Sequence, residues 1–112
     1  MKEFTLIFKI KSLNDFKPSP EQMKERIVWL QNIAESDKLV NKGNTLLPMP
    51  ESAKTITANG NVKDGPFETT NITSGYMVVK AEHIDEAVEI AKANPIFKIG
   101  GSIEVREVLQ RH

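Results

Sequence analysis

A chain of 112 residues with 15 basic and 15 acidic side chains fits one domain of the common size, and it contains no long run of either charge. This balance argues against a binding surface for nucleic acid or for an anionic membrane. Because cysteine is absent, disulfides, thiolate catalysis and cysteine-ligated metal centres are excluded.

The N-terminal residues do not have the pattern of a secretion signal. An acid stands at position 3, and Lys9 follows a short apolar stretch. No segment has the length of a membrane span. We therefore expect a cytoplasmic protein, with a single domain over residues 1–112 and no membrane or nucleic-acid partner.

The first predicted elements are a strand over residues 3–10 and a helix that begins after Ser19. Every second side chain of the strand is apolar, which gives it a face made of Phe4, Leu6, Phe8 and Ile10. Ser19 can cap the helix, with Pro20 at its first position. Apolar side chains then recur at helical spacing as Met23, Ile27, Leu30 and Ala34. Trp29 and Ile33 lie at the edge of that stripe, and we expect core or interface packing for the tryptophan.

Residues 39–73 are rich in Asn, Gly, Thr and Pro, yet a structureless loop of that length would be unusual in a small domain. We predict strands over residues 44–47 and 54–58. Asn59-Gly60 is typical of a hairpin turn that leads the chain toward Asp64. Residues 68–74 are predicted to form a polar loop.

The last part of the chain predicts a strand over residues 76–81, a helix that ends at Asn94-Pro95, and a strand over 103–109. The order of elements predicts an α+β fold, a ferredoxin-like split βαβ sandwich with an inserted hairpin. Two helices cover only one face of such a sheet. We expect apolar side chains on the open face, among them Ile7, Met77 and Val79, and therefore a homodimer built through that face.

The most informative motif is Asp64-Gly65-Pro66-Phe67, reached through the Gly/Asn-rich residues 59–63. Pro66 fixes its own φ and biases Gly65 toward extended backbone, while Gly65 can adopt angles that a side chain would forbid. The backbone between Asp64 and Phe67 therefore has little freedom, and the two side chains are held in a defined relation.

Together with three later segments, this motif resembles the DGPF branch of the YCII-related family of dimeric α/β-barrel proteins. The later segments are residues 75–79 (Gly-Tyr-Met-Val-Val), residues 85–87 (Asp-Glu-Ala), which open a helix that Pro95 closes, and residues 102–106 (Ser-Ile-Glu-Val-Arg). They occur in the family's order over the second half of the chain, with a looser match across the first helix. The resemblance implies that the open sheet face meets a second copy to form a dimeric α/β barrel.

The resemblance also implies a catalytic role for Asp64, which corresponds to an aspartate assigned to an active-site cleft in the family. In that role Asp64 would perform acid–base work beside Phe67. The local sequence alone leaves an alternative, a turn residue whose carboxylate accepts hydrogen bonds from nearby backbone N–H groups. Glu68, directly after the motif, is predicted to be a solvated loop acid.

Glu104 and Arg106 are two residues apart on the last predicted strand, so their side chains project from the same face. A carboxylate and a guanidinium on the open face could bind a polar ligand, or could pair with each other or across the dimer. With Phe67 and Tyr76, they are the predicted ligand-binding residues.

Better-studied YCII-like proteins carry a histidine in the first helix that is proposed to act with the aspartate. The comparable residues here, 23–27 (Met-Lys-Glu-Arg-Ile), contain none, and Arg26 or Lys24 lies nearest to its position. An arginine stays protonated, so it can orient an anion but cannot shuttle a proton. This departure argues against a histidine–aspartate dyad.

The two histidines and the glycine pattern predict no cofactor. His83 is expected to cap a helix or to be exposed, and His112 is the final residue. No spacing is typical of a metal site, and no phosphate-binding glycine loop precedes a helix. Neither a metal nor a nucleotide is therefore predicted.

Two functions are compatible with these patterns. The first is a homodimer that binds or transforms an unidentified small polar molecule in a cleft around Asp64. The second is a non-catalytic interaction or regulatory module, because relatives of this branch are sometimes found beside or fused to extracytoplasmic-function sigma factors. Only the first requires Asp64 to be shielded from water, and an exposed Asp64 with no adjoining cavity would favour the second.

Overall fold

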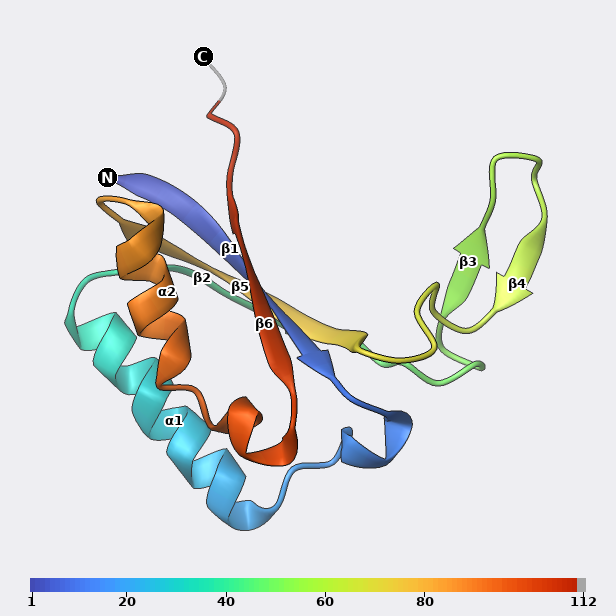
Figure 1. The fold of residues 1–112 in the computed structure, drawn as a ribbon, viewed down its shortest axis with the longest axis horizontal. Helices are drawn as coiled ribbons and strands as arrows, with labels where there is room; N and C mark the ends of the chain where they lie inside the picture. Colours follow the sequence, from blue (N-terminus) through green and yellow to red (C-terminus); the bar gives the residue numbers. More distant parts are fainter. Residues whose placement is uncertain (111–112) are drawn as a thin grey trace.

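The fold is a four-stranded antiparallel sheet with two helices on one face and a separate two-stranded hairpin, as the computed structural model of residues 1–110 describes it (Figure 1). In chain order the elements are β1 (Lys2–Ile10), the short 3-10 helix η1 (Leu13–Asp15), α1 (Pro20–Glu35), β2 (Leu39–Thr45), β3 (Lys54–Ile56), β4 (Val62–Asp64), β5 (Ile72–Ala81), α2 (Ile84–Lys92), η2 (Pro95–Ile99) and β6 (Ser102–Glu107). The sheet order is β2-β5-β1-β6, and β3 pairs only with β4. This is the predicted ferredoxin-like α+β fold with an inserted hairpin.

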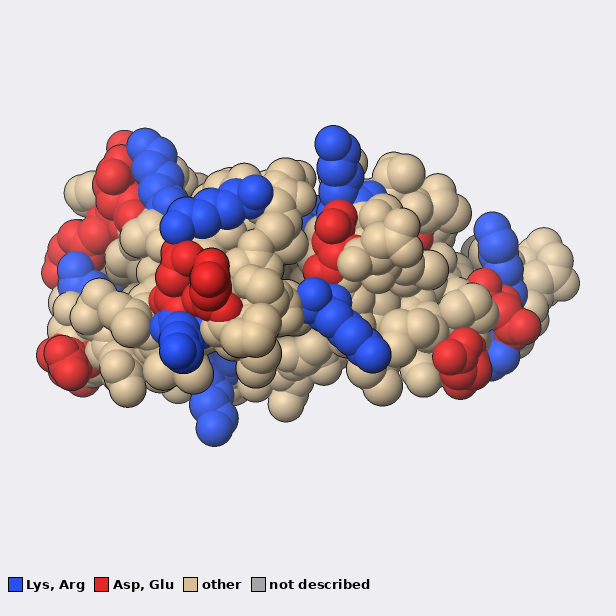
Figure 2. All heavy atoms as spheres, turned by 90° about the horizontal axis from the view of Figure 1, so that it is seen from below, with Lys and Arg blue, Asp and Glu red and all other residues tan. Residues whose placement is uncertain are grey.

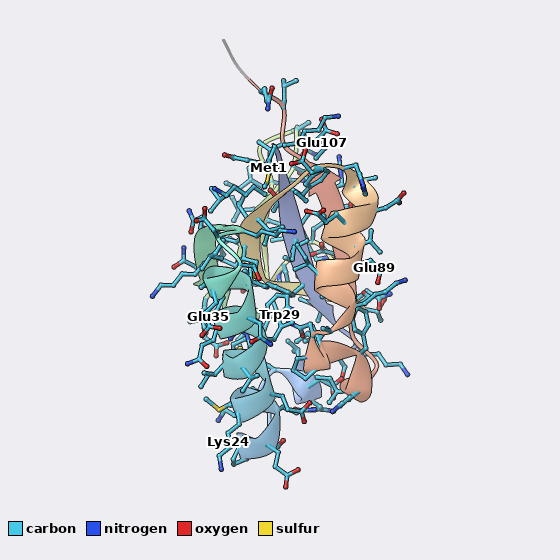
Figure 3. All side chains as sticks on the ribbon, turned by 90° about the vertical axis from the view of Figure 1, so that its left-hand side faces the viewer. Met1, Lys24, Trp29, Glu35, Glu89 and Glu107 are labelled. Atoms are coloured by element: carbon cyan, nitrogen blue, oxygen red, sulfur yellow. The ribbon has the colours of Figure 1, made fainter. Side chains whose placement is uncertain are left out.

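The alternating pattern of β1 places its apolar face against the helices. Phe4, Leu6, Phe8 and Ile10 are all buried, and the side chains between them are half-exposed. Strand β1 lies between β5 and β6, where a strand has neighbours on both sides. In Figure 3 the two helices lie side by side in front of the sheet. The core therefore lies between β1, β5 and the two helices.

Helix α1 begins as its sequence predicts. The Ser19 hydroxyl accepts a hydrogen bond from the backbone N–H of Gln22 at 3.2 Å, and the Gln22 side chain accepts one from the N–H of Ser19 at 3.2 Å. This reciprocal pair satisfies two of the N–H groups that a helix start leaves without partners.

The buried stripe of α1 differs from the predicted one. Trp29 and Ile33 are buried in the core, whereas Met23 and Ile27 are about half exposed. The Trp29 Nε1–H donates to the carbonyl of Ile90 on α2 at 2.8 Å, and its ring meets Phe8 edge-on with centroids 6.1 Å apart. The C-terminal half of α1 is thus packed against its neighbours, so the core role expected for the tryptophan is confirmed.

The expectation for the open face is wrong for two of its three residues. Met77 and Val79 are only 2% and 0% exposed, because in the register of β1 and β5 they stand opposite Leu6 and Phe4 on the helix-covered face. Directly paired residues of antiparallel strands share a face. The open face instead carries Ile7 together with Tyr76 and Val78 of β5.

Several strand boundaries also differ from the predicted ones. β2 spans Leu39–Thr45 rather than residues 44–47, and it pairs with β5 through irregular register near Asn41 and Asn44. β5 begins at Ile72, inside the predicted polar loop, because Ile72 pairs with Ile10 beyond a bulge in the β1 ladder.

The hairpin strands and the last strand are shorter than predicted. β3 ends at Ile56, because the turn around Asn59-Gly60 is closed one residue later by a hydrogen bond from Thr57 N to Asn61 O at 3.0 Å. β6 ends at Glu107, and Val108 N beyond it donates a hydrogen bond to Glu3 O. The predicted hairpin turn itself is confirmed.

Residues 46–71, here called the arm, leave the sheet and carry β3 and β4 away from the helices (Figure 1). The radius of gyration is 15.1 Å, whereas a compact domain of this length has about 13 Å. The molecule measures 43 × 42 × 18 Å along its principal axes. The arm therefore gives a flat, extended outline to an otherwise small domain.

Candidate functional site

A cavity of about 400 Å³ lies between the N-terminal half of α1, the ends of β1, β2 and β5, and the start of η2. Its apolar wall includes Phe8, Ile10 and Leu30, and its polar groups include Asp15, Arg26 and Asn94. Segments far apart in the sequence therefore enclose one space. A concave site with mostly apolar walls and a few polar groups is the usual form of a small-molecule site.

The cavity exists because α1 packs on the sheet only through its second half. In the first half of α1, Met23 and Ile27 are not buried in the core. They line the cavity instead. On the opposite side, Pro95 starts η2 and is buried, and the Asn94 carbonyl oxygen Oδ1 caps this turn by accepting from Ile96 N at 2.8 Å. Helix α1 and the turn η2 thus form opposite walls of the cavity.

Gly43 allows β2 to approach β5 at the cavity wall. Its φ is +67°, and a Cβ built on it would lie 1.7 Å from the carbonyl oxygen of Tyr76. Its backbone N–H donates to the Asn41 side chain at 2.7 Å. Only glycine fits this close approach without moving the strand.

The sequence leaves either Arg26 or Lys24 as the residue nearest to the family's histidine position. In the structure, Arg26 is the one in the cavity wall. Arg26 lines the cavity and Lys24 does not, and in Figure 3 Lys24 points away from the fold. The position compared with the family's histidine therefore contributes a permanent cation to the cavity.

Asp64 and Phe67 lie on the arm, and neither is among the residues that line the cavity. The Asp64 side chain is 71% exposed and pairs with Lys54 across the hairpin, and Phe67 is 80% exposed. Gly65 between them has a φ of +94°, and its N–H donates to Ala53 O at 2.7 Å. The backbone of the motif is thus fixed, while both of its flanking side chains face water in the single chain.

Tyr76, Glu104 and Arg106 lie together on the open sheet face. Glu104 pairs in register with Ile7, and Arg106 with Thr5, which confirms that the two charged residues share that face. Arg106 Nη1 donates to Glu104 Oε2 at 2.9 Å, while the Tyr76 hydroxyl accepts from Asn44 Nδ2 at 2.9 Å. The structure thus pairs Glu104 with Arg106, one of the arrangements that the sequence left open, and it brings neither of them to Asp64.

Glu68 belongs to a charge network that the sequence did not reveal. It is half-buried, accepts from the Thr73 hydroxyl at 3.1 Å, and lies 3.5 Å from Lys9 Nζ, which also lies 4.0 Å from Glu104. Burial acts to raise the pKa of Glu68, but hydrogen bonds from its own backbone and Thr73 and the charge of Lys9 outweigh it and lower the pKa below its ordinary value. Glu68 is therefore an anchored acid at the root of the arm rather than a solvated one.

The second helix is positioned by polar contacts away from the cavity. His83 Nδ1 accepts from the backbone N–H of Glu86 at 3.2 Å, which confirms its expected capping role. Lys38 Nζ lies 2.8 Å from Glu86 Oε1, and this hydrogen bond lowers the pKa of Glu86. His112 lies outside the described residues.

The described surface mixes both signs of charge. Figure 2, which views the molecule from below relative to Figure 1, shows Lys and Arg interspersed with Asp and Glu across the whole face. Within residues 1–110, no group of three or more His, Asp or Glu side chains is placed to hold a metal ion. Among the helices of the same range, none is both long and apolar enough to cross a membrane.

The model of the YCII-related domain matches residues 4–111, nearly the whole chain. Among curated proteins no match was found. A solved structure with the same fold is 5-chloro-2-hydroxyhydroquinone dehydrochlorinase of Burkholderia phenoliruptrix AC1100, in complex with 2,5-dihydroxybenzoquinone. It is 16% identical, with a TM-score of 0.54, and the alignment covers 97% of this chain and 94% of that chain.

Proposed function

This chain belongs to the family of YCII-related domains, and from that membership we propose that it binds and transforms a small polar molecule in the cavity beside Arg26. The carrying observation is the cavity of about 400 Å³ with apolar walls and few polar groups. The dehydrochlorinase named above has this fold and, by its name, acts on a small hydroxylated ring compound. A ligand of that general size fits the cavity.

We further propose that Asp64 serves this site from the arm, as the acid–base or ligand-orienting group, and that its motif places the chain in the DGPF branch. The support is the position of the arm's roots. Thr45 directly precedes the arm, and Ser74 is the third residue after its end. Both residues line the cavity. A ligand at the cavity mouth would therefore lie beside the two roots of the arm that carries Asp64 (Figure 1).

The test of this function is a screen for ligands that stabilise the native state. Small polar ring compounds and small aliphatic acids, amides and alcohols are added one at a time, and the midpoint of thermal unfolding is followed by calorimetry. A compound present at about 100 times its Kd adds about 2.7 kcal/mol of stability, which raises the midpoint by several degrees. Failure of every compound of the cavity's size would argue against a small-molecule site.

Asp64→Asn tests the role of the aspartate with any compound that the screen finds. The substitution keeps the shape and removes an exposed ion pair with Lys54, which contributes only about 0–1 kcal/mol. Fold and oligomeric state should persist while ligand affinity or turnover falls. A variant that unfolds, with unchanged affinity in the remaining folded fraction, would make Asp64 a structural turn residue.

We propose that the open sheet face packs against a second copy, which would close a dimeric barrel. Ile7, Tyr76 and Val78 stand on that face, and no described helix covers it. Burying a standard interface of about 800 Å² per partner would remove these side chains from water. Glu104 and Arg106 would then lie in or near the interface and contribute polar contacts to the partner or to a ligand there.

Sedimentation at micromolar concentration is expected to give a dimer for the wild type and a monomer for Val78→Lys, because a lysine on the packed face would bury an unpaired charge. Val28→Lys is the matched control, since Val28 is exposed on α1. That control should remain a dimer. A monomeric wild type would show that the chain forms no dimer. Loss of the dimer only in Val28→Lys would show that the dimer uses another surface.

The alternative function, a non-catalytic interaction module, is favoured by one observation. Asp64 and Phe67 are exposed on the arm, where Ile56 and Val62 also face water. Such an apolar projection suits contact with another macromolecule. The ligand screen separates the two functions, because only the first requires an occupant of the cavity.

A further inference from the structure

The cavity carries an excess of positive charge. Arg26 and Lys42 line it, and Asp15 is the one carboxylate among its lining residues. Eight other basic side chains within residues 1–110 lie within 4 Å of a carboxylate, but no such partner occurs for Arg26 or Lys42 in that range. The two cations at the cavity are therefore available to a ligand.

Asn94 adds a neutral donor to the same space. The residue is only 6% exposed, and its Oδ1 is occupied by the N–H of Ile96. Its Nδ2 makes no hydrogen bond to another group within residues 1–110. In the same range every fully buried side-chain nitrogen or oxygen has a hydrogen-bond partner, so Nδ2 is not fully buried. The Nδ2 group is therefore not sealed from solvent, and Asn94 is one of the residues that line the cavity.

The rest of the wall limits the kind of anion that fits. Phe8, Ile10 and Leu30 present apolar surface, so a ligand must bury an apolar body along with its charge. A singly charged carboxylate costs less to remove from water than a dianionic phosphate, and Asp15 would repel a second negative charge. The planar guanidinium of Arg26 matches the two oxygens of a carboxylate.

We propose that the ligand of this cavity is a small carboxylate with an apolar body, held by Arg26. This proposal rests on the proposed function, because it names the chemical class of that ligand. Lys42 supplies the second positive charge and Asn94 an N–H donor, while the apolar wall takes the body of the molecule.

The experiment compares carboxylates with their own amides at constant ionic strength. Benzoate, phenylacetate and cinnamate are each paired with the corresponding amide, and the Kd of every compound is measured by calorimetric titration. We expect each carboxylate to bind the wild type more tightly than its amide. Arg26→Gln should weaken the carboxylates by about tenfold or more and leave the amides unchanged, and Arg26→Lys should lie between.

Lys24→Gln is the matched control, because it removes one positive charge from the same helix at a residue that does not line the cavity. It should keep the preference for carboxylates. Equal binding of acids and amides, or equal losses in Arg26→Gln and Lys24→Gln, would overturn the proposal. If neutral compounds bind but no carboxylate does, this proposal fails and the proposed function stands; if nothing of the cavity's size binds, both fail.

Discussion

Leu6→Ala is expected to lower the free energy of unfolding by about 2–5 kcal/mol, a large share of the roughly 5–15 kcal/mol that holds a domain together. Leu6 is 0% exposed on β1, where it stands opposite Met77 on one side and Val105 on the other. Its truncation leaves a void between two strands and the helices. Urea unfolding followed by far-ultraviolet circular dichroism should show a lower midpoint with an unchanged slope.

Val62→Ala is the control for this core substitution. Val62 is exposed on the arm, so its truncation should change the free energy of unfolding by no more than about 0.5 kcal/mol. A loss below about 1 kcal/mol in Leu6→Ala, or equal losses in both variants, would mean that the centre of the sheet does not carry the fold.

Gly43→Ala is expected to be at least as damaging, although it adds a single carbon. The new Cβ would lie 1.7 Å from the Tyr76 carbonyl oxygen and 2.6 Å from its carbon, which are backbone atoms of the neighbouring strand. Either β2 separates from β5 or the residue changes conformation, and both break the edge of the sheet. We expect a loss of several kcal/mol, beyond the roughly 1 kcal/mol of backbone strain alone, and a cavity that no longer binds its ligand.

Gly60→Ala isolates the steric part of this effect. Gly60 also has a positive φ, +85°, but a Cβ on it would meet nothing within 4 Å. Both variants therefore share the conformational penalty, and only Gly43→Ala adds the collision. Similar unfolding midpoints for the two would show that β2 yields easily and that the close approach has little importance.

Much of the fold could be predicted because local patterns agree with the tertiary structure. The alternation of β1 is confirmed residue by residue, and the Ser19 cap and the Asn59-Gly60 turn have the expected geometry. Each of these signals depends on neighbours within about four residues. The ferredoxin-like order then follows from the sequence of elements.

The face of β5 could not be predicted from its own sequence. Met77 and Val79 are apolar, but so are Tyr76 and Val78, and a strand with apolar residues at both parities does not indicate which set is buried. Which set is buried depends on the pairing of β5 with Leu6 and the other core residues of β1. That pairing joins segments far apart in the sequence.

The cavity was also beyond local reasoning. The sequence points to Arg26 only through the resemblance, while Asp15, Lys42 and Asn94 come from three other segments and form no shared motif. Asn94 had a visible signal, the Asn-Pro step that ends the helix, but it indicated a stop rather than a site. The position of Asp64 depends on where the arm points, which its rigid Gly-Pro step does not determine.

The contacts of Trp29 with its neighbours make it an intrinsic fluorescence probe of the fold. Trp29 is the one tryptophan of the chain, it is buried, and it joins α1 to α2 through the Ile90 carbonyl. Its edge-on partner Phe8 also lines the cavity. Emission from this indole therefore senses the docking of the two helices directly and the occupancy of the cavity through one intervening ring, without any attached dye.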